Sequence, residues 1–452
     1  MTEPADLELR RVEQELHSRW PESRLEPSLD RIRALTNLLG EPQAAYPVIH
    51  VTGTNGKTST ARIIESLLRA FGLRVGRYTS PHLQTVRERI ALDGQPIDAE
   101  RFVDTYDDVA PYLAFVDEQS AARGGPPLSF FEVLTAMAYA AFAEAPVDVG
   151  VVEVGLGGTW DATNVVDGQV AVVTPVALDH EEYLGDSVVD IAVEKSGIVK
   201  PGSVTVIAQQ PVDVAEVLLR RVAEVEATVA REGLEFGVLD RAIAVGGQLL
   251  TLRGLGGEYD EILLPLHGAH QAHNAVVALA AVEAFLGGGR DRLDLDVIRD
   301  GFAMASSPGR LEVVRRSPTV LLDAAHNPSG AVALADALGD AFTFDRLVGV
   351  VGILADKDAR GLLFALEPVL AEVVVTQNSS PRALPAADLA SIAEDVFGSG
   401  RVTVASSLPD ALDVAVGLAE GSGELGGAGV LVTGSVVTVG EARTLLTADP
   451  PS

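Results

Sequence analysis

The chain has 452 residues, of which 47% are hydrophobic, so it is long enough for two or three domains with separate cores. Its 34 basic and 64 acidic residues give a formal net charge of −30, which disfavours binding to the phosphate backbone of nucleic acids. It has no cysteine, which excludes disulfides and a thiol nucleophile. Its first residues are charged throughout, which argues against a secretory signal, and it has no long apolar run that would predict a membrane span. We therefore expect a cytoplasmic protein that binds neither nucleic acid nor membranes.

The first predicted elements form a β-α-β unit. Residues 47–52 (PVIHVT) read as a short buried strand. Thr58 to Phe71 reads as an amphipathic helix that stops at Gly72, and residues 73–79 read as the next strand. Such a unit implies parallel strands joined by a right-handed crossover.

The same alternation continues through the first half of the chain. Ser129 and Glu132 form an S-x-x-E capping box, which predicts a helix running to about Glu144. The apolar, β-branched runs at 147–154 and 170–177 are typical of buried strands. We expect a helix over 187–199, an antiparallel excursion over 225–265 and another helix over 272–285.

A glycine-rich, charged segment at 287–295 reads as a linker. After it, strands predicted at 319–323, 346–352, 372–376, 401–404 and 429–433 alternate with helices. The sequence thus predicts an α/β protein with two domains. An N-terminal P-loop ATPase domain with a mostly parallel sheet covers residues 1–290, and a smaller Rossmann-like α/β domain covers residues 296–452.

The stretch VIHVTGTNGKTST (48–60) ends as a phosphate-binding loop does, although Val51 stands where the common G-x-x-x-x-G-K-[ST] loop has glycine. Gly53 and Gly56 let the backbone approach a phosphate, Lys57 can reach the β- and γ-phosphates, and the Thr58 hydroxyl can ligate Mg²⁺. A chance G-K-T in an ordinary loop is the alternative. We expect ATP to bind at Gly53, Thr54, Asn55, Gly56, Lys57, Thr58 and Ser59.

The variant T-G-T-N-G-K-T resembles the phosphate loop of the Mur ligase superfamily, the ATP-dependent amide-bond ligases. Further blocks resemble the folylpolyglutamate synthases and their bifunctional bacterial form with dihydrofolate synthase. In chain order these blocks are YTSPHL (78–83), ERI (88–90), FEVLT (131–135), EVGLGGTWDATN (153–164), LDH (178–180), EKSGI (194–198), HQAHNA (270–275), PGRLE (308–312), DAAHNP (323–328) and DKD (356–358).

Two residues at predicted strand ends suggest a metal site. Glu153 lies near the end of an apolar strand, where a carboxylate is costly unless it is paired or metal-bound, and His180 follows another strand. With the Ser80 hydroxyl they supply hard ligands suited to Mg²⁺. An ion pair for Glu153 and an ordinary role for His180 are the alternatives; the resemblance implies that Ser80, Glu153 and His180 bind metal.

Lysine is rare, because only four of the 34 basic residues are lysines: Lys57, Lys195, Lys200 and Lys357. Lys195 falls on a predicted helix, where a solvated face is the ordinary interpretation. The resemblance implies instead a carbamylated lysine that helps to bind a second Mg²⁺, a reaction open to lysine and closed to arginine. Lys357 is either a turn residue or a substrate contact, and Lys200 reads as a turn residue.

The resemblance implies further roles in ATP and glutamate binding. Asn274 would contact adenine, Arg310 would clamp the phosphates and Asp323 would contact ATP. His326 and Ser435 would bind the incoming glutamate. The usual D-G-A-H-N-P block here has Ala324 in place of glycine, which is tolerable unless that position needs a positive φ.

The resemblance also implies a folate site. Pro81, His82, Phe131 and Asp161 would hold the acceptor, although two aromatics at a helix start (Phe130 and Phe131) are more often core residues. Lys57, His180, Lys195 and Arg310 would be the catalytic residues.

The expected function is ATP-dependent ligation of L-glutamate to reduced folates and to dihydropteroate through an acyl phosphate. ATP and two Mg²⁺ would be the cofactors, small molecules the only partners, and the protein a monomer; a need for K⁺ is left open. One alternative is a Mur-type ligase with a UDP-muramyl acceptor, against which the SPHL and FEVLT blocks speak. Another is a P-loop NTPase that uses no amino acid.

Overall fold

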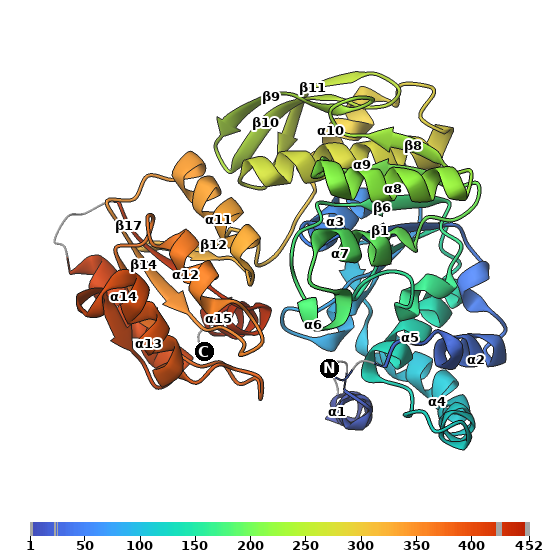
Figure 1. Ribbon diagram of the computed structural model, residues 1–452, viewed down its shortest axis with the longest axis horizontal. Coiled ribbons are helices and arrows are strands. Elements are labelled where there is room, and N and C mark those ends of the chain that lie inside the picture. Colours follow the sequence, from blue (N-terminus) through green and yellow to red (C-terminus); the bar gives the residue numbers. More distant parts are fainter. Residues whose placement is uncertain (1–2, 22–23, 25, 422–426, 448–452) are drawn as a thin grey trace. The chain divides into compact units, whose positions relative to one another are not determined.

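The computed structural model describes residues 3–21, 24, 26–421 and 427–447 (Figure 1). It divides into two compact units. One unit comprises the described residues of Met1–Arg241, Leu249–Leu264 and Ala272–Ala305. The other comprises those of Ala242–Gln248, Pro265–Gln271 and Ser306–Ser452. Each unit is built on its own sheet, as the predicted α/β architecture requires.

The sheet of the first unit has, among the described residues, eight strands in the order β4-β3-β2-β5-β1-β6-β7-β8. The pairs from β2 to β8 are all parallel, and β3 and β4 add an antiparallel edge. The strands are β1 (Val48–Thr52), β2 (Val75–Tyr78), β3 (Ile90–Leu92), β4 (Gln95–Pro96), β5 (Val149–Glu153), β6 (Val170–Val173), β7 (Val204–Ile207) and β8 (Thr228–Arg231).

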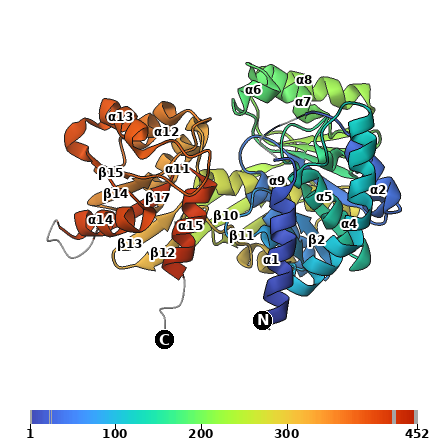
Figure 2. The same ribbon diagram turned by 90° about the horizontal axis from the view of Figure 1, so that it is seen from below.

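Helices cover this sheet (Figures 1 and 2). They bury its apolar side chains. Residues of α1, α2, α4 and α5 share a core with Val48, Tyr78 and Val152, whereas α7 and α8 pack with Val173 and Ile207. The helices are α1 (Glu3–Ser18), α2 (Asp30–Leu38), α3 (Lys57–Ala70), α4 (Ala99–Ala122), α5 (Phe130–Glu144), α6 (Glu181–Leu184), α7 (Val188–Ser196), α8 (Val212–Glu224), α9 (Ala269–Gly287) and α10 (Leu295–Ala303).

The predicted helix start at Ser129 is confirmed in detail. The Ser129 hydroxyl accepts a hydrogen bond from the Glu132 amide (3.2 Å), and the Glu132 carboxylate accepts one from the Ser129 amide (2.8 Å). This reciprocal pair is a capping box, and α5 begins at the next residue.

The prediction of a separate antiparallel segment at 225–265 is partly wrong. Its first strand, β8, joins the large sheet in parallel with β7, because α8 supplies the crossover that a parallel strand needs. A separate three-stranded sheet of order β11-β10-β9 starts only at Gly237. Its strands are β9 (Gly237–Ala244), β10 (Gly247–Arg253) and β11 (Glu258–Leu264).

The second unit has a six-stranded sheet, counted over its described residues, in the order β12-β13-β17-β14-β15-β16. The pairs from β13 to β16 are parallel, while β12, which the sequence did not predict, is an antiparallel edge. The strands are β12 (Glu312–Arg316), β13 (Thr319–Leu322), β14 (Arg346–Val351), β15 (Glu372–Val375), β16 (Val402–Val404) and β17 (Ala428–Thr433).

Helices complete the second unit. Side chains from α11, α12 and α13 form a core with Leu321, Val351 and Val373. Figure 2 shows these helices beside the strands of the sheet. The helices are α11 (Pro328–Ala341), α12 (Ala359–Leu366), α13 (Ala386–Phe397), α14 (Leu408–Glu420) and α15 (Val436–Thr447). None of the helices described in either unit is long and apolar enough to cross a bilayer.

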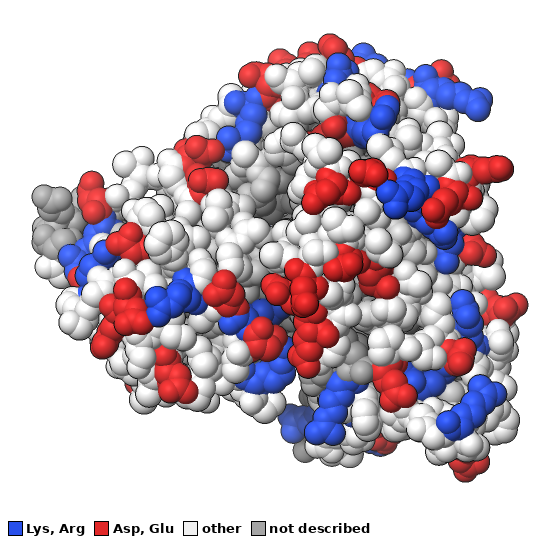
Figure 3. All heavy atoms as spheres, viewed as in Figure 1, with Lys and Arg blue, Asp and Glu red and all other residues white. Residues whose placement is uncertain are grey.

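Acidic side chains are prominent on the surface, in line with the negative net charge. On the face shown in Figure 3, Asp and Glu side chains are spread widely, and the Lys and Arg side chains lie among them. An anionic substrate therefore needs a local cationic site.

Candidate active site

The phosphate loop lies between β1 and α3, as the sequence predicts. Gly53 has a φ of +143°, and a Cβ there would lie 1.9 Å from Thr174 Oγ1. Gly56 has a φ of +87°, and a Cβ there would lie 2.4 Å from Asn274 Oδ1. Both positions therefore require glycine. The buried side chain of Asn274 lies directly against the loop, so the structure brings this predicted ATP residue to the phosphate-binding segment.

The residues after β6 hold the loop in place. The Thr54 amide donates to the Pro175 carbonyl (2.9 Å). The Thr54 hydroxyl donates to the Ala177 carbonyl and accepts from the Ala177 amide, both at 3.0 Å. The amides at the start of α3 lie beyond this anchored part, where the helix dipole favours an anion.

Lys57 and Lys195 meet at the same carbonyl oxygen. Lys57 Nζ donates to the carbonyls of Gly53 and Thr54, both at 3.0 Å. Lys195 Nζ, from α7, donates to the Gly53 carbonyl at 2.8 Å. The lysine that the resemblance marks as reactive is therefore part of the phosphate-loop structure.

The ordinary interpretation of Lys195, a solvated helix face, is wrong, because its side chain is buried. Burial, assisted by the nearby charge of Lys57, lowers the pKa of Lys195 to about 7. A substantial fraction of its amine is thus neutral at neutral pH, and the neutral amine is the form that can react with CO₂. This environment suits a carbamate-forming lysine.

Glu153, Thr58 and Ser80 converge at the end of β5. The Thr58 hydroxyl donates to both carboxylate oxygens of Glu153, at 2.8 and 3.0 Å. The Ser80 amide donates to Glu153 Oε2 at 3.3 Å, and Glu153 is almost completely buried. A buried carboxylate beside two hydroxyl-bearing residues is a hard-oxygen donor set, which fits Mg²⁺.

His180 lies outside the cluster of Glu153, Thr58 and Ser80. It precedes α6 with a φ of +53°, and its amide donates to Asp179 Oδ1 (2.9 Å). Among the described residues, no group of three His, Asp or Glu side chains is arranged to hold a metal ion. A magnesium site here would thus depend on the hydroxyls of Thr58 and Ser80 beside Glu153, and the role of His180 stays a prediction.

The two aromatics at the start of α5 have different environments. Phe130 is buried, stacked on His17 and placed under the guanidinium of Arg89 at 5.0 Å, so it is a packing residue. Phe131 is only partly buried. A Cβ on Gly155 would lie 2.4 Å from its ring, so the ring lies on the backbone that follows β5.

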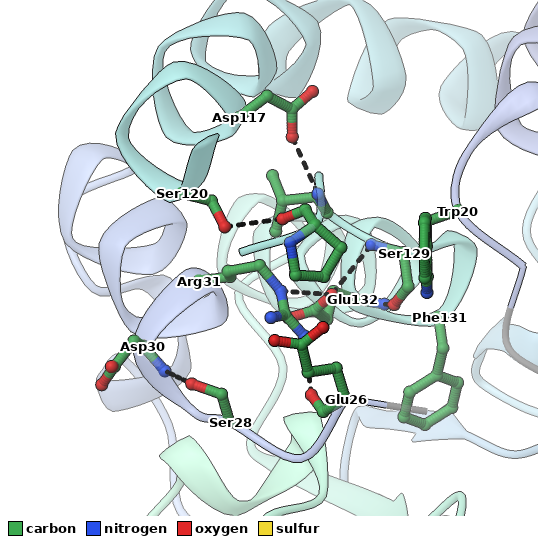
Figure 4. A network of polar contacts seen from close by, with 12 residues as sticks. Trp20, Glu26, Ser28, Asp30, Arg31, Asp117, Ser120, Ser129, Phe131 and Glu132 are labelled. Atoms are coloured by element: carbon green, nitrogen blue, oxygen red, sulfur yellow. Dashed lines mark hydrogen bonds and ion pairs between the residues drawn. The ribbon is translucent and has the colours of Figure 1, made fainter. Parts of the chain in front are cut away.

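Figure 4 shows what fixes this end of α5. Arg31 Nε donates to Glu132 at 3.0 Å, and one Arg31 NH group donates to the Glu26 carbonyl at 3.0 Å. The ion pair is nearly buried, and it joins α2 to the capping box. The backbone next to Phe131 is therefore anchored to α2 by these contacts.

Asp161 is turned inward. Its Oδ2 accepts from the Leu156 amide (2.8 Å), and its Oδ1 accepts from the Thr163 amide (2.9 Å) and hydroxyl (2.5 Å). Burial raises its pKa, while these donors oppose the rise. The Thr163 hydroxyl also contacts Nε2 of the fully buried His50 at 2.9 Å. The sequence reasoning missed this His50–Thr163–Asp161 chain, because nothing in the spacing of 113 residues joins His50 to Thr163.

The loop after β2 carries Pro81 and His82. Arg89 Nε donates to His82 Nδ1 at 3.0 Å. The Glu88 carboxylate accepts from the amides of Leu83 and Gln84. The loop is thus stabilised from its own C-terminal end, which orders the segment predicted to hold folate.

In the second unit, Asp323 and Ser435 follow the neighbouring parallel strands β13 and β17, so they lie at the same edge of that sheet. Asp323 Oδ1 accepts from the Ala325 amide and Oδ2 from the Leu311 amide, both at 2.8 Å. Burial raises the pKa of Asp323, and the charge of Arg310 opposes that rise. Ala324 does not have a positive φ, so alanine fits there.

Two further predicted residues at this edge also have local partners. His326 Nδ1 lies 3.0 Å from the Ala324 carbonyl, which can only accept, so Nδ1 carries the proton. The Ser435 hydroxyl accepts from the Thr438 amide (3.2 Å) and the Val437 amide (3.1 Å) at the start of α15. The buried amide of Asn378, which the sequence reasoning missed, donates to Ser435 and Thr438.

Comparison with known proteins agrees with this picture. Residues 309–436 match the family model described as "Mur ligase, glutamate ligase domain". The chain is 55% identical to the dihydrofolate synthase/folylpolyglutamate synthase of Mycobacterium tuberculosis, over 98% of this chain and 94% of that protein.

Solved structures are similar over almost the whole chain. The Mycobacterium tuberculosis folylpolyglutamate synthase complexed with ADP has a TM-score of 0.94 and 54% identity, covering 99% of this chain and all of that one. A folylpolyglutamate synthase–AMPPCP–folate complex has a TM-score of 0.83 and 31% identity, covering 97% of this chain and all of that one. The chain therefore belongs to the dihydrofolate synthase/folylpolyglutamate synthase family of Mur-type ligases.

Proposed function

We propose that the chain is an ATP-dependent ligase that joins L-glutamate to reduced folates and also to dihydropteroate. The observation that supports this most strongly is the cluster around the phosphate loop. There Lys57 and the buried Lys195 meet at Gly53, and Thr58 binds Glu153. One similar protein has been solved with ADP, and another with AMPPCP and folate.

In this proposal the phosphate loop binds the triphosphate and Asn274 binds the base. Arg310 and Asp323 would also contact ATP, and His326 and Ser435 would bind the incoming glutamate. The sequence predicts domains at residues 1–290 and 296–452, whereas residues 296–305 belong to the first compact unit of the structure.

Glu153, Thr58 and Ser80 would hold Mg²⁺, and His180 and carbamylated Lys195 would hold a second ion. When bound, Mg²⁺ neutralises charge on the phosphate oxygens. The depressed pKa of Lys195 supports carbamate formation, because the neutral amine attacks CO₂ and an anionic oxygen ligand replaces a repelling ammonium.

The chemistry needs no protein nucleophile. A carboxylate oxygen of the acceptor attacks the γ-phosphorus of ATP, the new O–P bond forms, the bond to the β-phosphate oxygen breaks and ADP leaves. The amine of glutamate then attacks the acyl carbon and loses a proton, the C–N bond forms, and phosphate leaves with the former carboxylate oxygen. Lys57 and Arg310 would stabilise the charge on the transferred phosphoryl group.

The functional test is ADP release from purified protein that requires both Mg²⁺ and glutamate, measured with tetrahydrofolate and with dihydropteroate. Turnover with both acceptors supports the bifunctional assignment, and turnover with tetrahydrofolate alone restricts it to polyglutamylation. Turnover only with a UDP-muramyl acceptor would refute the folate assignment and keep the ligase chemistry. ATP hydrolysis that needs no amino acid would refute both.

The remaining assignments are also proposals: a monomer in the cytoplasm, two Mg²⁺ and, as an open question, K⁺. Titration of activity with each ion, and the mass in solution, test them.

A further inference from the structure

A second charged residue on α3 shares the helix face that carries Thr58. Arg62 lies four residues after Thr58, one helical turn further, so the two side chains project from neighbouring positions. Thr58 binds Glu153, and the charge of Glu153 also acts on Arg62, together with those of Glu65 and Glu88. Arg62 therefore lies close to the end of β5 and to the loop after β2.

Arg62 differs from the cations around it in having no protein acceptor. It is partly buried, yet it makes no hydrogen bond or ion pair with any residue that the structure describes. Burial and the charge of Arg77 lower the pKa of Arg62 to about 10, so it stays protonated at neutral pH. The five donors of this guanidinium have no protein acceptor, so an anionic ligand can take them.

The neighbouring cations already have acceptors within the protein. These are Lys57 with the Gly53 and Thr54 carbonyls, Lys195 with the Gly53 carbonyl, Arg77 with the Glu65 carboxylate at 2.7 Å, and Arg89 with His82 Nδ1. Of these five cations, Arg62 is the one without an acceptor in the part of the protein that the structure describes.

The proposed reaction requires two anions to meet at this edge. The γ-phosphate has the loop, Lys57 and Mg²⁺, whereas the acceptor carboxylate must approach an edge that already carries Glu153 and Glu88. A guanidinium matches a carboxylate with two parallel hydrogen bonds, and it also offsets the repulsion by those two carboxylates. We propose that Arg62 binds the reacting carboxylate of the acceptor through two parallel hydrogen bonds. This inference rests on the proposed folate ligase function.

The test compares two ligands that differ only in that carboxylate: tetrahydrofolate, and its analogue in which the reacting carboxylate is a carboxamide. Their dissociation constants are measured with wild-type protein, with Arg62→Gln and with Arg62→Lys. Arg69→Gln is the matched control, because Arg69 lies on the same helix two turns further on, beside Gly94. Circular dichroism and thermal unfolding establish that each variant is folded.

Wild-type protein and Arg69→Gln should bind the carboxylate ligand about 10- to 100-fold more tightly than the carboxamide, the range expected for charged hydrogen bonds. Arg62→Gln should bind the two equally and raise the KM for the acceptor while leaving the KM for ATP unchanged. Arg62→Lys keeps the positive charge but cannot donate two parallel hydrogen bonds, so it should lose most of the preference for the carboxylate over the carboxamide. This variant tests the proposal even if Arg62→Gln does not fold.

Wild-type discrimination in either folded Arg62 variant would overturn the inference. Failure of the wild-type protein itself to bind or use tetrahydrofolate would instead overturn the proposed function. A purely structural role of Arg62 would weaken binding of both ligands equally, and that result too would contradict the proposal.

Discussion

Replacing Lys195 by Met tests whether the buried amine has the properties that the proposed chemistry needs. Met has a similar length and an apolar body, so it fills the space without a titrating group. The substitution removes the hydrogen bond to the Gly53 carbonyl and the charge beside Lys57. Ligation should fall to background, and partial rescue by added short-chain carboxylates would support the carbamate as the missing metal ligand.

The size of the effect on stability follows from the pKa of Lys195. It falls from 10.5 to about 7, a difference of 3.5 units, which corresponds to roughly 5 kcal/mol against the buried ammonium. Between pH 7 and pH 10.5 the unfolded state binds the proton and the folded state does not. The lysine therefore makes the free energy of unfolding rise with pH in that window, by about 1.4 kcal/mol per pH unit, and has no such effect below it.

Urea denaturation of wild type and Lys195→Met, from about pH 6 to about pH 9 in buffer free of Mg²⁺ and bicarbonate, measures this difference. The unfolding free energy of wild type minus that of the variant should be flat below pH 7 and rise by roughly 2–3 kcal/mol between pH 7 and pH 9. Parallel curves over the whole range would refute a depressed pKa for Lys195 and, with it, this reason for its reactivity.

Three further substitutions probe the phosphate loop and the Glu153 carboxylate beside it. Lys57→Ala should lower the ligation rate by at least roughly 100-fold, as loss of one charge-stabilising group does, with an unchanged circular dichroism spectrum; retained turnover would contradict the assignment. Gly53→Ala should destabilise the protein by about 1–3 kcal/mol, since its Cβ meets Thr174, and should abolish ATP binding, which calorimetry would report. Glu153→Gln can still accept from Thr58 but has lost its charge, so the Mg²⁺ concentration for half-maximal activity should rise at least about tenfold; an unchanged requirement would place the metal elsewhere.

The sequence predicted the phosphate loop and most of the buried parallel strands, because both signals are local, but β3, β4, β7 and β12 were missed. Buried parallel strands read as continuous apolar runs, and the loop's glycines and lysine lie within five residues. The excursion at 225–265 was misread at its start, since β8 belongs to the large sheet through its pairing with β7. Pairing is a tertiary property that a four-residue run does not encode.

The candidate site was only partly predictable from sequence. Glu153 was recognised from its position at a strand end, and its bond to Thr58 joins residues 95 apart. The burial of Lys195 could not be read from a helix that also carries polar residues, because it depends on the loop packed over it. Arg62 was missed altogether, since an arginine on an amphipathic helix gives no sign of lacking a partner.

The most direct test of the proposed acyl-phosphate chemistry follows one oxygen atom. Tetrahydrofolate labelled with ¹⁸O in its reacting carboxylate is incubated with the protein, ATP, Mg²⁺ and glutamate, and the released phosphate is analysed by mass spectrometry. The account predicts one ¹⁸O atom in each phosphate, because the carboxylate oxygen that attacks the γ-phosphorus leaves with it. Phosphate that carries no label while the ligation product accumulates would contradict it.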